Sequence, residues 1–418
     1  MVMGRVAPGL GRCLDGGGGG GTGQSSGCVS VPDGAAGLSV LSVGRARVGG
    51  VDGTELGGGL ALLDTPSLYF RAFYGVPRSV TAPDGTPVNA VRGLLDVLAR
   101  QILDLRPRHL VCCFDADWRP AFRVELVASY KAHRVAEVLT PAEVPASTSV
   151  SPVPPGDGDA ATGAAGAGGE GGVQVEEVPD ELTPQLPVID DMLDAFGIAR
   201  AQAAGFEADD VIGTLTTRFP YGDGDGWAVR DPAPGQGPPT GGWAGPVDVL
   251  SGDRDLFQLI RDDVPVRVRY SVEKFAIIDE AAVTARYGVP GRAYGDFAAL
   301  RGDPSDGLPG VAGIGAKTAA ALLTRFGSLT AALDALDAGQ QDGFPAGARR
   351  RLEVARDYLD RAEVVVRVVP DVPLPPLRTA LPAAPADPDR VLALAERWGL
   401  TSAATRLARA LATSAAGR

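Results

Sequence analysis

Acidic residues stand at the ends of several short apolar runs, and this pattern constrains the fold of the chain more than any other feature. Asp64 and Asp115 each come directly after such a run, and Asp253 comes shortly after another. Short apolar runs that do not alternate with polar residues indicate parallel strands that are buried on both faces. Ligands of such sheets bind beyond the carboxyl ends of the strands, so we expect these acids to converge there.

Further acids belong to the same expected cluster. The predicted metal-binding residues are Asp64, Asp115, Glu207, Asp209, Asp210, Asp253, Asp255, Asp303 and Asp306. Two unpaired carboxylates about 5 Å apart repel each other by roughly 3 kcal/mol at an effective dielectric constant of about 20, so a cluster of this size needs cations. Carboxylate oxygens without His or Cys partners select hard divalent ions, and we therefore expect two Mg²⁺ ions, which Mn²⁺ can replace.

Each acid also has a plainer interpretation when it is taken alone. Asp64 can cap a helix that follows it, and the acids of 207–210 can lie at a helix start, where the helix dipole favours negative charge. One of the two acids in 251–255 can form an Asx turn. These interpretations account for single residues, but they account poorly for three packed acids at 207–210.

A basic segment follows Asp115. If it is helical, Lys131 and Arg134 share one face, and together with Arg123 and Tyr130 they supply phosphate donors and one base-stacking surface. A solvated basic helix is the alternative. The candidate catalytic cations are Lys131, Arg134, Arg123 and Arg71.

A glycine-rich turn at 310–318 opens a predicted helix. It is not a P-loop, because Ala316 separates Gly315 from Lys317 where that motif needs an adjacent Gly-Lys pair. Backbone N–H groups, the helix N-terminus and Lys317 can instead hold a DNA phosphate without reading bases. Taken alone, the pattern fits an ordinary turn between helices about as well. The candidate DNA-binding residues are Tyr130, Gly310, Gly313, Ile314, Gly315, Lys317 and Thr318.

The 57 glycines and 34 prolines are unevenly distributed, which predicts that part of the chain does not fold. We expect a disordered extension at 1–57 and low-complexity inserts at about 145–178 and 221–246. The remaining divisions are an α/β catalytic domain at 58–290, a helical DNA-binding subdomain at 291–385, and a C-terminal amphipathic helix and tail at 386–418.

Strands alternate with helices in the first of these domains, which favours an α/β fold with a mostly parallel central sheet flanked by helices. Hydrophobic periodicity predicts helices at 90–105, 189–196, 209–219, 316–326, 346–364 and 388–411.

The formal charge of −12 argues against a nonspecific polyanion binder, whose affinity depends on bulk positive charge, but it leaves room for a local basic surface. The few cysteines suit reduced thiols better than disulfides or a zinc site. The N-terminal residues lack the apolar stretch of a signal peptide, and no apolar run is long enough to span a bilayer. A cytoplasmic protein without membrane contact is therefore expected.

The order of these motifs resembles the 5′ nuclease family, which includes the N-terminal nuclease domain of bacterial DNA polymerase I, phage 5′ exonucleases and flap endonucleases. The resemblance covers roughly 58–385, interrupted by the inserts, with six motifs in the family's order. It implies a PIN/resolvase-like fold with a helical arch and an all-α subdomain that contains a helix–three-turn–helix element. It also implies a stand-alone 5′-3′ exonuclease or 5′-flap endonuclease of DNA replication and repair, with a functional link to a DNA polymerase.

The same resemblance implies roles for the residues. The nine acids would hold two Mg²⁺ ions directly or through water, Lys131 and Arg134 would contact the scissile phosphate, and 310–317 would grip the duplex and carry a monovalent cation such as K⁺. Products would have 5′-phosphate and 3′-hydroxyl ends. One Mg²⁺ is expected near Asp64, Asp115 and Glu207, and the other near Asp253, Asp255 and Asp303.

Three positions depart from the family pattern. Thr65 stands where Gly is usual, Arg92 stands where an aromatic residue is frequent, and Gly307 stands where Asn is common. Gly307 removes a side chain that could brace Asp306, which would affect the second metal site.

Two other functions stay open. One is a catalytically weak DNA-binding scaffold, which Gly307 and the interrupted arch favour and the nearly complete acid set disfavours. The other is a nuclease that mainly removes RNA primers, because no motif of the chain identifies a reader of the 2′-hydroxyl.

Overall fold

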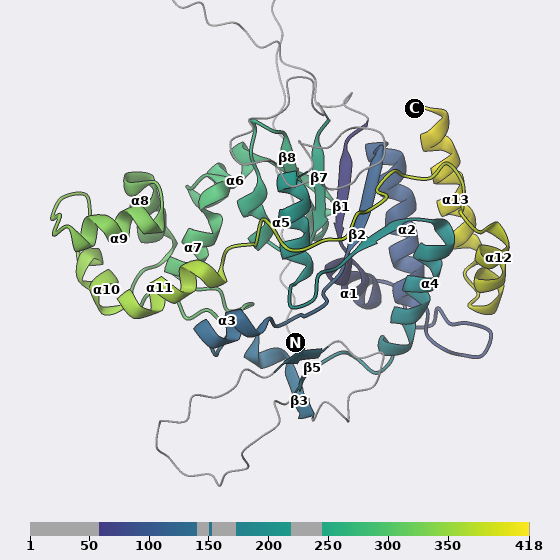
Figure 1. Cartoon of the computed structure of the whole chain (residues 1–418), viewed down its shortest axis with the longest axis horizontal. Coiled ribbons are helices and arrows are strands. Elements are labelled where there is room, and N and C mark those ends of the chain that lie inside the picture. Colours follow the sequence, from purple (N-terminus) through teal and green to yellow (C-terminus); the bar gives the residue numbers. More distant parts are fainter. Residues whose placement is uncertain (1–57, 140–149, 153–172, 219–244, 418) are drawn as a thin grey trace, which may run out of the picture. The chain divides into compact units, whose positions relative to one another are not determined.

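A six-stranded sheet, in the order β6-β2-β1-β7-β8-β9, forms the centre of the structure (Figure 1). Its strands are β1 (Leu60–Asp64), β2 (His109–Cys113), β6 (Ala199–Ala201), β7 (Val247–Ser251), β8 (Val266–Tyr270) and β9 (Ala276–Ile278). Neighbouring strands are parallel except β8 and β9, which are antiparallel. The predicted mostly parallel sheet is confirmed.

The computed structural model describes residues 58–139, 150–152, 173–218 and 245–417. All of them belong to one compact unit, Gly53–Arg418. The predicted extension at 1–57, most of the predicted insert at 145–178 and most of that at 221–246 lie outside the described residues.

The strand β1 is buried on both faces, as its unbroken apolar sequence indicates. Leu60 and Leu62 belong to a core that also contains residues of α5 (Ala208–Arg218) and of the helices between residues 294 and 365. Ala61 and Leu63 belong to a second core. Successive side chains of a strand point to opposite faces, so β1 is covered by helices on both sides and its backbone is fixed from above and below.

The second core is formed with three helices that lie on one side of the sheet. They are α2 (Asn89–Leu105), α4 (Leu186–Phe196) and α13 (Thr401–Ala416). The last of these packs against α2, and α12 (Pro388–Arg397) packs against α4 (Figure 1). The C-terminal segment therefore completes the cover of the sheet.

Two predicted helices are each divided into two. The segment predicted as one helix at 388–411 forms α12 and α13, because the chain turns at Gly399, whose φ of 65° is a left-handed conformation that favours glycine. The segment predicted as 346–364 forms α10 (Ala348–Val354) and α11 (Arg356–Val365), and Ala355 between them has φ −94° and ψ 10°.

The helical C-terminal part begins after the sheet. Its helices are α6 (Glu280–Tyr287), α7 (Tyr294–Arg301), α8 (Ala316–Phe326), α9 (Leu329–Asp337), α10 and α11. The helices α7 and α8 pack together and are joined by residues 302–315, which contain the predicted glycine turn. The helix predicted at 316–326 has the bounds that the sequence indicated.

The described part of the predicted helical arch contains little helix. A short helix, α3 (Ala121–Leu126), is followed by a 3₁₀ helix, Ala132–Arg134, and then by the antiparallel strands β3 (Val135–Leu139), β5 (Val173–Glu176) and β4 (Val150–Pro152). Lys131 directly precedes the 3₁₀ helix and has φ 48°, a left-handed conformation, so it is not part of a helix that contains Arg134. The prediction that Lys131 and Arg134 share a helical face is therefore wrong.

Among the described residues, no single helix has the length and apolar character needed to cross a membrane. The bent pair α8 and α9 meets that test only when its two helices are taken together.

The burial of β1 predicts how the fold responds to a truncated core residue. Leu62 is 0% exposed, so Leu62→Ala should lower the free energy of unfolding by about 2–5 kcal/mol through lost contacts and a residual cavity. Urea denaturation followed by circular dichroism measures the change. Leu392→Ala is the matched control, because Leu392 on α12 is 54% exposed and should lose less than about 1 kcal/mol. Equal losses in the two variants would contradict the assigned core.

Candidate active site

The sheet register brings three of the predicted acids to the same edge. Asp64 is level with Cys113 on β2, so Asp115 lies two residues further along its chain. Leu63 is level with Leu250 on β7, so Asp253 lies two residues beyond the level of Asp64. Three neighbouring parallel strands thus end in carboxylates, as the sequence predicted.

The first turn of α5 adds Asp209 to these three residues. We call Asp64, Asp115, Asp209 and Asp253 the open carboxylate group, because no Lys or Arg of the described chain forms a salt bridge with any of them. Burial first, and then repulsion from Asp115 and Asp253, raise the pKa of Asp64 to about 7. Burial, and then repulsion from Asp253 and Asp64, raise the pKa of Asp209. Burial and mutual repulsion therefore disfavour the ionised forms of these carboxyl groups.

Hydrogen bonds orient two members of the open carboxylate group. One oxygen of Asp64 caps α1 (Thr65–Gly75) by accepting from Ser67 N at 3.2 Å, and the other accepts from Ser251 Oγ at 2.5 Å. Asp115 accepts from Ala208 N at 2.7 Å, and burial raises its pKa to about 6. The helix cap uses only one oxygen of Asp64, so capping does not exclude a metal-binding role for the other oxygen.

Two other predicted acids are tied to Arg123. Its guanidinium donates to Glu207 Oε2 at 2.7 Å and to the two oxygens of Asp210 at 2.8 and 2.6 Å. Tyr130 donates its hydroxyl to the same Glu207 oxygen at 2.7 Å, and Lys131 pairs with the other oxygen of Glu207. Asp210 is thus a partner of Arg123, and the structure does not bring it into the open carboxylate group.

The burial of this network corrects part of the sequence interpretation. Arg123 is 2% exposed and Tyr130 is 4% exposed. A side chain with so little exposed surface offers no face on which a base can stack, so the predicted stacking surface at Tyr130 is not present. Arg123 likewise lies inside the protein as the partner of Glu207 and Asp210 and is not presented to a phosphate.

The remaining predicted acids lie near a turn at 303–308. Asp303 is paired with Arg301 at 3.2 Å and with Arg254 at 3.6 Å. Asp306 lies 3.8 Å from Arg134. Burial and repulsion from Asp306 raise the pKa of Asp255, whereas attraction to Lys131 and a hydrogen bond from Asp255 outweigh burial and lower the pKa of Asp306. Asp303 and Asp306 are therefore paired with arginines, whereas Asp255 is hydrogen-bonded to Asp306 and has no basic partner among the described residues.

Two residues near the site were missed by the sequence analysis. Ser251 bonds to Asp64 and accepts from Asp253 N at 2.8 Å. A hydroxyl at the end of an apolar strand is a signal that could have identified it. Glu176 ends β5, and burial first, then repulsion from Asp115, raise its pKa to about 7. No sequence signal marks Glu176, because it follows a low-complexity segment.

The predicted cations occupy different positions. Lys131 and Arg134 are both partly buried, and they contribute to the electrostatics of Asp115. Arg71 is exposed, and its described contact is a hydrogen bond to the carbonyl of Val272 at 3.4 Å, with no salt bridge to any of the predicted acids among the described residues.

The glycine turn before α8 combines an anchor with exposed neighbours. Ile314 is 3% exposed and belongs to the core. It therefore supports the turn from inside, and the prediction that it contacts DNA is wrong. Gly313, Gly315 and Lys317 are exposed on either side of it. Gly310, with φ 69°, and Thr318, whose N–H donates to the Gly315 carbonyl, shape the two ends of the turn. The free N–H groups of a helix start and a lysine thus face solvent together.

The side chains fit a divalent cation by their chemistry. Within the described residues, no three His, Cys, Asp or Glu side chains already converge as a metal site. The open carboxylate group nevertheless offers oxygen ligands only, and its raised pKa values reflect burial and repulsion that a cation would relieve.

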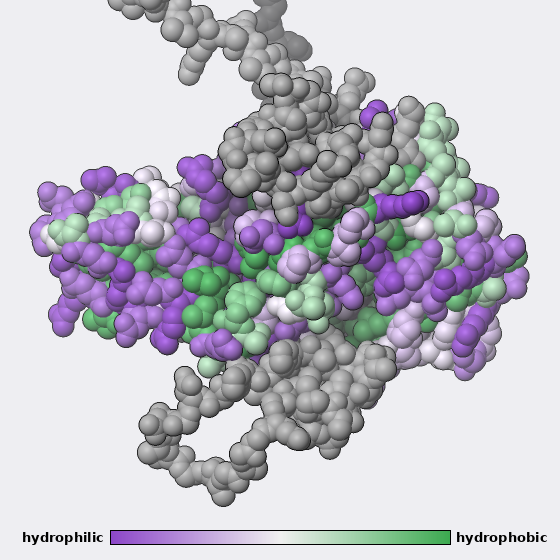
Figure 2. Space-filling model, viewed as in Figure 1, coloured by the Kyte–Doolittle hydropathy of each residue, from purple (hydrophilic) through white to green (hydrophobic). Residues whose placement is uncertain are grey.

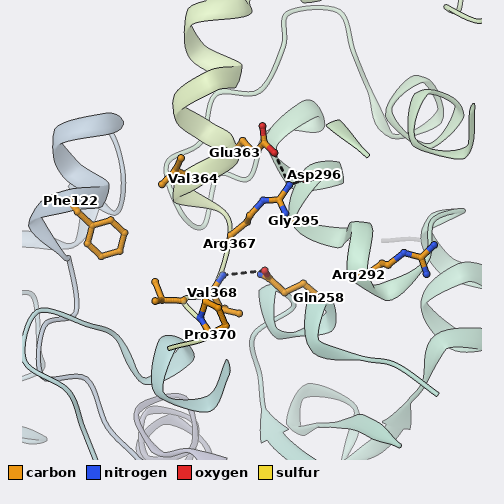
Figure 3. A pocket seen from close by; sticks show the side chains of 11 residues that line it. Phe122, Gln258, Arg292, Gly295, Asp296, Glu363, Val364, Arg367, Val368 and Pro370 are labelled. Carbon is orange, nitrogen blue, oxygen red and sulfur yellow. Dashed lines mark hydrogen bonds and ion pairs between the residues drawn. The ribbon is translucent and has the colours of Figure 1, made fainter. Parts of the chain in front are cut away.

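A separate cavity of about 600 Å³ lies between α3, α7 and the end of α11 (Figure 3). Part of its polar lining is internally paired: Arg367 bonds to Glu363 and Asp296, and Val368 N donates to Gln258 (Figure 3). None of the nine predicted acids lines it. The cavity is therefore distinct from the acid cluster.

The surface shown in Figure 2 is largely hydrophilic, with apolar residues visible among the hydrophilic ones.

Family models match two parts of the chain. Residues 59–230 match the 5′-3′ exonuclease N-terminal resolvase-like domain, and residues 289–389 match the 5′-3′ exonuclease C-terminal SAM fold. Among solved structures, the T5 D15 protein co-crystallized with metal ions is similar at 16% identity, with a TM-score of 0.47, over 84% of this chain and 99% of that one.

Sequence relatives extend over most of the chain. A 5′-3′ exonuclease of Streptomyces coelicolor is 51% identical over 349 residues, which cover 83% of this chain and 98% of that protein. A 5′-3′ exonuclease of Mycobacterium tuberculosis is 47% identical over 364 residues, 85% of this chain and 98% of that protein. DNA polymerase I of Mycobacterium bovis is 32% identical over 334 residues, 79% of this chain but 29% of that protein. The chain belongs to the 5′-3′ exonuclease family.

Proposed function

We propose that this 5′-3′ exonuclease hydrolyses DNA phosphodiesters near 5′ ends and at 5′ flaps, and that it uses two Mg²⁺ ions, which Mn²⁺ can replace. Metal dependence is general in the family. The observation that carries the proposal is the open carboxylate group, which has no salt bridge to a Lys or Arg of the described chain and has Lys131 and Arg134 nearby. Three of its four acids follow the ends of adjacent strands, and the fourth, Asp209, lies in the first turn of α5. A cluster of this kind is suited to a substrate that arrives with cations and carries phosphate.

The acids have two kinds of role in this proposal. Asp64, Asp115, Asp209 and Asp253 would hold the cations directly, and Glu207 would join them when Lys131 turns to the phosphate. When bound, such cations supply an activated water and stabilise the charge of the phosphate and leaving oxygen. Asp303 and Asp306 are paired with arginines and Asp255 is hydrogen-bonded to Asp306, so we assign these three acids to the support of the site and to contacts through water.

The basic residues act on the phosphate or position those that do. Lys131 and Arg134 would neutralise the charge that grows on the phosphate in the transition state. Arg123 holds Glu207 and Asp210 in place, and it donates to the carbonyl of Val365 at 3.1 Å, so it fixes the site from behind. Arg71, at the exposed surface of α1, would contact the DNA strand further from the scissile bond.

The glycine turn would hold the duplex part of the substrate. Its exposed N–H groups and Lys317 can bind one backbone phosphate, and a K⁺ ion at this turn is part of the same proposal. The 32% identity to a DNA polymerase I supports a role beside a polymerase in replication and repair, where RNA primers are a second class of substrate. The buried free thiols of Cys112 and Cys113 support a cytoplasmic location.

Removal of one carboxylate from the open group tests the metal proposal. Asp253→Asn keeps the size of the side chain and removes its charge, and it should lower the rate of cleavage of a 5′-flap DNA by at least about a hundredfold. The measurement uses DNA labelled at either end, with Mg²⁺ or with EDTA. Wild type should release short 5′ fragments only with the metal.

The control for this variant is Asp342→Asn, which removes an exposed charge from a loop of the helical part and should keep wild-type activity. Tight DNA binding by wild type without cleavage in Mg²⁺ or Mn²⁺ would instead support the scaffold function. Faster cleavage of an RNA-containing flap than of the matched DNA flap would support the primer-removing function.

The role of Lys131 can be separated from a backbone effect. Lys131→Ala should lower turnover by at least about a hundredfold, because one preorganised charge is lost, and it should leave duplex affinity within a few-fold. Lys274→Ala is the matched control: Lys274 is exposed and its φ of 56° is close to the 48° of Lys131. Single-turnover kinetics and fluorescence anisotropy give the two quantities. Equal losses of turnover and affinity would contradict the assigned role.

Lys317→Ala should show the opposite pattern. Loss of one phosphate contact at the glycine turn should weaken duplex binding and reduce the slope of log affinity against log salt by about 1, with little change in turnover at saturating DNA. A salt titration of duplex binding in EDTA measures the slope. An unchanged slope would remove Lys317 from the proposed phosphate contact.

A further inference from the structure

The turn at 303–308, which precedes the glycine turn, is closed on itself. Asp303 N donates to the Leu308 carbonyl at 3.0 Å, and Leu308 N donates back to the Asp303 carbonyl at 2.9 Å. Inside this pair, Asp306 N donates to the Asp303 carbonyl at 3.2 Å. Gly307 N also donates to the Pro304 carbonyl at 3.3 Å, and these four backbone hydrogen bonds over six residues leave the turn little freedom, so it can serve as a fixed support for a neighbouring segment.

That neighbouring segment carries the two cations assigned to the phosphate. Lys131 N donates to the Asp306 carbonyl at 3.1 Å, and Arg134 Nη2 donates to the Ser305 carbonyl at 3.2 Å. These bonds join positions more than 170 residues apart in the chain. The backbone of Lys131 lies in the left-handed region, with φ 48°, which a residue other than glycine keeps only when its surroundings hold it there. The turn at 303–308 supplies one of these holding contacts.

Gly307 makes this close approach possible. Its φ is 70°, and a Cβ atom built at this position would lie 2.0 Å from the Ser129 carbonyl oxygen, 2.9 Å from the Ser129 carbonyl carbon and 3.4 Å from Lys131 N. All three atoms belong to the backbone, so they cannot move aside as a flexible side chain would. Any side chain at 307 would therefore push 129–131 away from the turn.

The turn is also joined to the glycine turn that is proposed to hold the duplex. Gly302 and Gly310 flank it and pack against each other: a Cβ at Gly310 would lie 2.4 Å from Gly302 N. Val311 N donates to the Leu300 carbonyl at 2.9 Å, and Gly310 N donates to the Tyr358 hydroxyl at 3.2 Å. A continuous set of backbone contacts therefore runs from the glycine turn, through 303–308, to Lys131.

We propose that Gly307 is a positioning residue of this enzyme: by allowing the turn at 303–308 to pack directly on Ser129 and Lys131, it sets the place of the Lys131 ammonium relative to DNA held at the glycine turn. The proposal rests on the phosphate role of Lys131 given above. It replaces the expectation that glycine at 307 impairs the second metal site through a missing brace, since the space for such a brace is filled by the Ser129 carbonyl.

The test compares two glycines that both have a positive φ. Gly307→Ala and Gly327→Ala both place alanine at positive φ, 70° and 89°, but a Cβ at Gly327 meets nothing within 4 Å. Both variants therefore place a side chain at positive φ, and only Gly307→Ala is expected to push against the backbone of 129–131. Gly307→Ala should lower kcat on a 5′-flap DNA by about tenfold to a hundredfold, as expected when a catalytic group is misplaced by about 1 Å, and leave KM and duplex affinity within about threefold. Gly327→Ala should keep the wild-type kcat.

A second measurement does not depend on the folding of Gly307→Ala. In wild type, hydrogen exchange of the Lys131 amide should be slowed by at least about a hundredfold relative to an unstructured peptide, because this N–H donates to the Asp306 carbonyl. Unprotected exchange at Lys131, or an equal kcat for Gly307→Ala and Gly327→Ala, would overturn the inference. Failure of wild type to cleave flap DNA with any divalent metal would instead overturn the proposed function, so the two failures are distinguishable.

Discussion

The buried fork of Arg123 is the interaction on which the rest of the site depends. Its guanidinium joins α3 to Glu207 and Asp210 at the start of α5, and it also donates to the carbonyls of Val365 and Arg367 at the end of α11. Charges this deeply buried are stable only when they are paired and hydrogen-bonded on all sides. The pairing therefore fixes the helical C-terminal part against the sheet and, through Glu207, fixes one wall of the acid cluster.

The nine predicted acids differ in whether a basic side chain pairs with them, and this difference does not follow their order in the sequence. Four of the nine predicted acids, Glu207, Asp210, Asp303 and Asp306, have a basic side chain within 4 Å. Asp255 has no basic partner among the described residues and is hydrogen-bonded to Asp306. The four acids of the open carboxylate group have no such partner among the described residues. This division separates acids that hold the protein together from acids that remain available to a cation, although both kinds lie near the same sheet edge.

The sequence predicted the sheet and its acid-bearing edge because apolar runs and their terminal acids are local signals. It also predicted α8, whose glycine turn is a clear start. It did not predict the left-handed backbone at Lys131. The residues adjacent to Lys131 in the sequence do not determine this conformation, because it depends on contact with a turn some 175 residues away. The burial of Tyr130 and Ile314 was missed for a related reason: a residue beside functional neighbours resembles a contact residue until its packing partners are known. The divided helices at Ala355 and Gly399 show that hydrophobic periodicity does not reveal a break between two helices when their apolar residues continue on the same face.

The attachment points of the two inserted segments relate differently to the chemistry. The segment 219–244 leaves the described chain after α5 and returns at the start of β7, and a parallel strand starts at the sheet edge opposite its acids. The segments 140–149 and 153–172 leave and return through β3, β4 and β5, whose first residue pair, Val135 with Glu176, directly follows Arg134. Changes of length between α5 and β7 thus fall at the sheet edge away from the acids. Changes between β3 and β5 fall beside Arg134, a cation proposed to bind the phosphate, and would offer a route by which related enzymes diverge in the substrates they admit.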